Sequence, residues 1–110
     1  MPFDSTPPIT LLDPPEVHLE DNLPYTRVVS EVPDDHTYAD PGSWELAYSA
    51  ADWEGETPDT QPTGPWSYDS SPTTHGDTYA TWATQPESGC WCVRYSAGGI
   101  RSQWSLGVAP

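Results

Sequence analysis

Three short runs of aromatic and β-branched residues occupy the last third of the chain, and turn signals separate them. The runs cover residues 79–84, 90–96 and 100–106, and the turns contain Gly89 and the Gly98-Gly99 pair. Short runs joined by glycine-containing turns are typical of an antiparallel meander. The sequence therefore predicts a mostly β protein with a small antiparallel body, arranged as a meander or like a sandwich.

Alternation within the second run indicates which side chains face a core. Every second residue of this run is large and apolar: Trp91, Val93 and Tyr95. Cys90 and Cys92 lie on the opposite face, where two strand positions of this spacing are about 6–7 Å apart at Cα, near or beyond the limit of a relaxed disulfide. We therefore expect free, buried thiols. In the third run, Ser102 interrupts an otherwise apolar face.

The composition limits the size of the core. The chain has 110 residues, of which only 35% are hydrophobic, and it contains 14 prolines and 8 glycines. Six tryptophans and six tyrosines compensate in part, because each aromatic ring buries a large area. We expect one domain at most, with a small aromatic core and long irregular segments around it.

The charge restricts the class of partner. Seventeen acidic residues face three arginines and no lysine, which gives a net charge of −14. Residues 1–77 hold sixteen of the acids and one arginine, whereas residues 78–110 hold one acid and two arginines. Such a chain is repelled by nucleic-acid phosphates and by anionic membrane surfaces. It suits a basic protein partner or a high-salt setting.

The first 24 residues are rich in proline. Six prolines in residues 1–24 exclude a helix of normal length and a central strand. Apolar residues lie between these prolines, and a disordered tail would rarely retain them. We expect an extended arm that lies on another protein surface and places these side chains in shallow pockets. The alternative is a flexible tail. The partner-binding residues of the arm are predicted to be Ile9, Leu11, Leu12, Val17 and Leu19.

Residues 25–110 are predicted to form the small β domain. Residues 25–32 alternate and are rich in β-branched side chains, and Pro24 and Pro33 bracket them, so we predict an edge strand. Residues 43–53 fit an alternating strand and also a short helix with a serine N-cap. The abundance of tryptophan and tyrosine favours the strand.

A long loop is predicted at residues 55–76, and aromatic residues lie in it or beside it. Trp53, Trp66 and Tyr68 are the candidates for exposed contacts. Aromatic ring faces stack on the apolar faces of pyranoses, so these residues favour a carbohydrate-binding groove. The competing interpretation is that so small a domain needs every tryptophan in its core.

Reactive side chains form no recognisable catalytic or metal-binding motif. Cys90 and Cys92, with His36 and His75, are ligand types that zinc accepts, but the histidines are scattered among turns and no second tight pair of ligands follows. The sequence also lacks a nucleophile elbow and a phosphate-binding loop. We predict no catalytic residues, no metal site, no cofactor and no enzymatic activity.

In overall character, the chain resembles the small accessory proteins of tailed-virus particles, which decorate or cement capsids or belong to tails. The features that carry this resemblance are the short aromatic sheet, the apolar residues spaced through a proline-rich arm, the long loop and the acidic charge. The resemblance implies a non-enzymatic structural protein that docks on capsid or tail subunits in multiple copies.

We expect neither a secretory signal nor a transmembrane segment, because no basic region or apolar run follows Met1. The expected location is the virion, after synthesis in the host cytoplasm. Two other classes are considered, a carbohydrate-binding module and an acidic inhibitor that imitates nucleic acid.

Overall fold

The chain folds into β-strands. The computed structural model describes residues 11–22, 25–33, 37–60, 65–85 and 88–110. Within these residues it contains no helix, and thus no helix that could cross a membrane. The prediction of a mostly β protein with antiparallel pairing is confirmed. The strands are β1 (Glu16–Asn22), β2 (Tyr25–Glu31), β3 (Glu45–Ser49), β4 (Ser67–Asp69), β5 (Thr74–His75), β6 (Tyr79–Gln85), β7 (Cys90–Arg94), β8 (Ser96–Ala97) and β9 (Ile100–Arg101).

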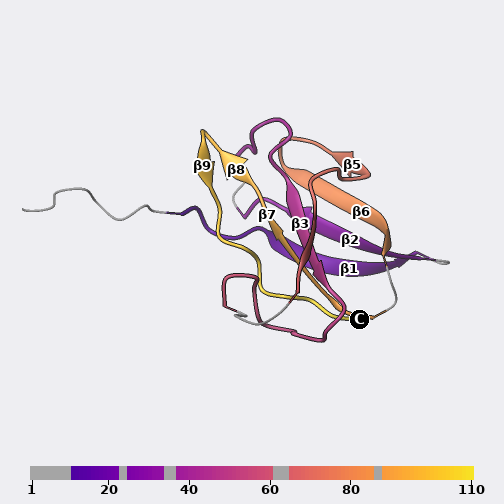
Figure 1. Ribbon diagram of the computed structural model, residues 1–110. Helices are drawn as coiled ribbons and strands as arrows, with labels where there is room; N and C mark the ends of the chain where they lie inside the picture. The colour runs from indigo at the N-terminus through magenta and orange to yellow at the C-terminus, as the bar shows by residue number, and fades with distance from the viewer. Residues whose placement is uncertain (1–10, 23–24, 34–36, 61–64, 86–87) are drawn as a thin grey trace, which may run out of the picture.

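The strands form two sheets and one small hairpin. One sheet has the order β1-β2-β6-β5 and the other the order β4-β3-β7, while β8 and β9 pair with each other. Figure 1 shows the two sheets as layers, with β3 and β7 in front of β1, β2 and β6. After β9, the chain returns beside β7, where Trp91 and Val108 form an antiparallel bridge. This strand order is that of an immunoglobulin-like sandwich. Because such sandwiches host many unrelated functions, the fold alone assigns none.

The core lies between the two sheets. Val28 of β2 and Trp82 of β6 meet Trp44, Leu46 and the apolar face of β7 in one buried cluster. The alternation predicted for β7 is confirmed, because this cluster contains Trp91, Val93 and Tyr95. Residues 45–49 form a strand rather than a helix, as the aromatic content favoured.

Three predictions about the strands are wrong. The C-terminal runs do not make one meander, since β6 and β7 belong to different sheets and the chain crosses between the layers after Gln85. Strand β2 is not an edge strand, because β1 and β6 flank it; the bracketing prolines lie outside its paired residues. The long loop at 55–76 contains two short strands, β4 and β5, which pair with β3 and β6.

The predicted boundary of the arm at residue 24 is also wrong. Leu12 forms a parallel bridge with Ser102, and its backbone N–H donates to the Arg101 carbonyl at 3.1 Å. The chain then turns at Pro14-Pro15 and joins the other sheet as β1, in register with β2. Proline explains this change of partner, because it cannot continue a ladder of backbone hydrogen bonds. Residues 11–22 are thus part of the body.

Serine hydroxyls take the place of backbone carbonyls as hydrogen-bond acceptors along the free edge of β7 and at Tyr95, the residue that follows it. The Val93 N–H donates to the Ser105 Oγ at 2.9 Å, and the Tyr95 N–H donates to the Ser102 Oγ at 3.0 Å. In return, the Ser105 and Ser102 N–H groups donate to the carbonyls of Val93 and Tyr95. Ser102, which interrupts the apolar pattern in the sequence, is therefore a pairing residue.

Replacing Ser105 by alanine is expected to destabilise the fold by at least about 1 kcal/mol, because the buried Val93 N–H loses its hydroxyl acceptor. Ser105 is 4% exposed, so water does not readily take its place. Urea unfolding followed by circular dichroism measures the change. Ser105→Thr keeps the hydroxyl and is the control. Equal midpoints for the alanine variant and the wild type would contradict the role of the hydroxyl.

Candidate functional site

The N-terminal and C-terminal segments run side by side and form one edge of the sandwich, here called the terminal edge (residues 11–17 and 100–108). Among the described residues, the exposed large aliphatic side chains all lie on this edge: Leu11 (40% exposed), Ile100 (47%) and Leu106 (65%). The other exposed large hydrophobic residues are tyrosines. Contiguous apolar surface is typical of a binding surface, and Leu106 belongs to such a surface because it also lines an apolar groove.

A groove lies along the terminal edge where the chain changes sheets. It has a volume of about 430 Å³. Its lining is mainly apolar and includes Pro14, Pro15, Val17, Pro33, Leu106 and Val108. The groove exists because β1 and the C-terminal segment belong to different layers, which separate after residue 13. No local pattern in the sequence indicates it.

The residues predicted to contact a partner differ in how far the structure buries them. Leu12, Val17 and Leu19 are partly buried against the protein's own core. Val17 also lines the groove, and the role of these three residues in binding a partner stays a prediction. Leu11 is exposed on the terminal edge and remains available to a partner. Ile9 lies outside the residues that the structure describes.

The aromatic residues predicted to be exposed pack mainly on one another. The Trp53 and Trp66 rings have centroids 5.7 Å apart, and the Tyr68 ring lies 5.9 Å from that of Trp104. Trp66 also packs against a second small cluster, on the outer face of β3 and β7, which contains Ala47, Cys92 and Trp104. Tyr68 remains 58% exposed. The tryptophans thus contribute to packing, as the competing interpretation of the sequence proposed.

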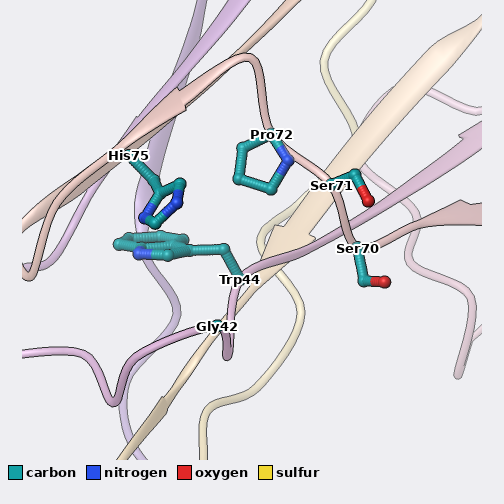
Figure 2. Close-up of a pocket in the computed structure, with 6 residues that line it drawn as sticks. All are labelled: Gly42, Trp44, Ser70, Ser71, Pro72 and His75. Atoms are coloured by element: carbon teal, nitrogen blue, oxygen red, sulfur yellow. The ribbon is translucent and has the colours of Figure 1, made fainter.

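A second pocket lies under the segment that joins β4 to β5. It measures about 290 Å³ and is lined by Gly42, Trp44, Ser70, Ser71, Pro72 and His75. Figure 2 shows the His75 ring lying over the Trp44 indole, with Pro72 and the two serines beyond it. The Trp44 N–H donates to the Gly76 carbonyl at 3.1 Å, which fixes the ring. Because Trp44 is only 1% exposed, its ring is not available to stack on a sugar, so the pocket does not favour the carbohydrate-binding alternative.

The two cysteine side chains are buried free thiols beneath the 53–56 segment. The Cys90 thiol donates to the Trp53 carbonyl at 3.3 Å, and the Cys92 thiol donates to the Glu56 carbonyl at 3.5 Å. The contact with Cys90 and burial both raise the pKa of Cys92 far above its ordinary value. Metal binding requires a thiolate, and the raised pKa of Cys92 opposes its formation at that residue. Within the described part of the chain, no three metal-ligand side chains of the His, Cys, Asp and Glu types converge.

An ion pair lies on the outer face of β1 and β2, where the register places Glu20 opposite Arg27. The Arg27 guanidinium donates to Glu20 at 2.6 Å. This hydrogen bond, followed by that of His18, lowers the pKa of Glu20. Exposed pairs of this kind contribute little to stability and mark no reactive site.

Comparison of this chain with protein-family models, with curated proteins and with solved structures finds no match.

Proposed function

We propose that this protein is a non-enzymatic structural component of a virus particle, and that it docks through its terminal edge on capsid or tail subunits. The observation that supports docking is the location of Leu11, Ile100 and Leu106, the exposed aliphatic residues, on one edge, where Leu106 also lines an apolar groove. Elsewhere the surface carries most of the seventeen acids, which favour contact with water or with basic patches.

The size of this surface suits a repetitive partner. Full burial of one leucine or isoleucine side chain contributes about 1.5–3 kcal/mol. The loss of translational and rotational freedom on association costs about 4–15 kcal/mol, so three such side chains give a weak single contact. Contacts between neighbouring copies on one assembly would link these single contacts and raise the overall avidity.

The virus particle as the location rests on the overall resemblance of the sequence to accessory proteins of tailed viruses. Under this proposal the chain is synthesised in the host cytoplasm and ends in the virion in multiple copies. It contacts neither nucleic acid nor membrane, because its net charge of −14 opposes both.

The test compares incorporation of edge variants into particles purified from the infected host. The wild-type chain is expected to sediment with the particles, and the double variant Leu11→Asp with Leu106→Asp to fall at least about tenfold in occupancy, since charged side chains replace buried apolar ones. Mass spectrometry of gradient fractions measures occupancy. Tyr68→Asp, at a similarly exposed position on β4, is the matched control.

Two results would contradict this proposal. One is a wild-type chain absent from the particles, and the other is equal incorporation of the edge variant and the Tyr68 control. Circular dichroism of each variant establishes that it is folded. Deletion of residues 1–24 is not a suitable test, because it removes β1 from its sheet.

A further inference from the structure

A small polar pocket opens at the β8–β9 end of the terminal edge. Its volume is about 230 Å³. Two of the three arginines of the chain, Arg94 and Arg101, line it, together with Glu45. In a chain with seventeen acids, two guanidinium groups at one pocket are a local reversal of the overall charge.

Nearby acids are already engaged within the protein. Glu45 accepts from Arg94 at 2.6 Å, and the Asp40 carboxylate accepts from the Gly98 and Gly99 N–H groups at 2.9 and 2.8 Å. No ion pair involves Arg101 in the part of the chain that the structure describes, and this residue is exposed. The charged side chains that line the pocket, Arg94, Arg101 and Glu45, sum to +1. The nearby Asp40 carboxylate keeps its negative charge, but its oxygens are occupied by the two backbone N–H groups.

The Arg94 side chain is held in a fixed orientation. Both its Nε and its Nη2 lie within hydrogen-bonding distance of the same Glu45 oxygen, at 2.8 and 2.6 Å. The guanidinium also lies over the Trp104 ring, 4.3 Å from its centroid. A guanidinium carries more N–H donors than Glu45 engages, so donors remain for a ligand, and the rigid arrangement lowers the entropy that binding costs.

We propose that this pocket binds one carboxylate of a partner protein, an aspartate or glutamate flanked by apolar residues. Arginine donors match the geometry of a carboxylate. Leu11 is exposed and lies opposite Arg101, next to the Leu12–Ser102 bridge, so it is available for a flanking apolar contact. A polyanion such as nucleic acid is disfavoured, because the remaining charge of the chain repels many phosphates more than one carboxylate. The role of this pocket in docking rests on the proposed function, but carboxylate binding itself does not.

The test is an NMR titration that follows the arginine side chains. The chain contains three arginines, so its Nε–H spectrum has three signals to assign. The probe is the peptide acetyl-Leu-Glu-Leu-amide, with acetyl-Leu-Gln-Leu-amide and inorganic phosphate as comparison probes at constant ionic strength. We expect saturable shifts of the Arg94 and Arg101 signals with the glutamate peptide, and none for Arg27, which pairs with Glu20.

A matched pair of variants locates the binding. Arg101→Gln is expected to weaken peptide binding by about tenfold, the loss of a charge-assisted hydrogen bond, whereas Arg27→Gln leaves it unchanged. The proposal is overturned if the glutamine peptide binds equally, if phosphate binds more tightly than the glutamate peptide, if Arg27 shifts in parallel, or if no signal saturates. If the peptide binds but particle incorporation does not depend on Leu11 and Leu106, docking through the terminal edge is refuted and the carboxylate site stands. If incorporation depends on these two leucines but the peptide does not bind, the carboxylate site is refuted and docking through the terminal edge stands.

Discussion

Replacing Trp44 by alanine is expected to destabilise the protein by about 3–5 kcal/mol, the cost of removing a large buried aromatic side chain. Trp44 is 1% exposed and belongs to the core cluster between the sheets. Its ring lies 5.2 Å from that of Tyr95, and its N–H donates to the Gly76 carbonyl. The variant loses the ring contact and the hydrogen bond, and leaves a cavity that the rigid β-strands around it fill poorly.

Urea unfolding followed by circular dichroism measures this loss. Trp53→Ala is the matched control, because Trp53 is partly exposed and lies outside the core cluster. We expect the control to lose less than half as much stability as the Trp44 variant. Equal losses for the two variants would show that the two sheets do not pack through Trp44.

Replacing Gly107 by alanine is expected to destabilise the protein by about 3 kcal/mol, the upper part of the range for overpacking a core. A Cβ atom at this position would clash with the Cys90 Sγ and lie 2.8 and 2.9 Å from the Trp53 and Glu56 carbonyl oxygens. Neither carbonyl is free to move, since Trp53 accepts from the Cys90 thiol and Glu56 accepts from the Gly107 N–H at 2.8 Å.

A double-mutant cycle with Cys90→Ala measures which contact causes the loss. Removing the Cys90 sulfur relieves the closest clash but not those with the carbonyls, so Gly107→Ala is expected to cost less in the Cys90→Ala background and still more than about 1 kcal/mol. Equal costs in the two backgrounds would exclude the sulfur as the cause. A cost near zero in the wild-type background would contradict the close approach of the 53–56 segment to Gly107.

The sequence identified individual strands where side chains alternate strongly. In β7, the alternation of Trp91, Val93 and Tyr95 with smaller or polar residues predicted correctly which face lies in the core. Residues 45–49 form the predicted strand for the same reason, because the Trp44, Leu46 and Tyr48 side chains leave one face. The short β4 and β5 escaped prediction, because pairing with β3 and β6 defines them more than local pattern does.

The candidate site was predicted only in part. Leu11 was identified from its place between prolines and is exposed, whereas Val17 and Leu19 fit the same pattern and pack against the core. An apolar residue in a proline-rich segment has the same sequence signature whether it contacts a partner or its own domain. Leu106 and Arg101 were not identified, since their exposure depends on which segments lie beside them.

By itself, the sequence determined the all-β class, the core face of β7, the aromatic core and the acidic charge, because these follow from side-chain periodicity and composition. The tertiary structure decided which strands are neighbours, where β1 leaves one sheet for the other, and which apolar residues stay exposed on the terminal edge. The physical reason is that strand pairing joins residues far apart in the chain. Leu12 meets Ser102, and Val93 meets Ser105, through backbone and hydroxyl hydrogen bonds that leave no periodic mark in the sequence.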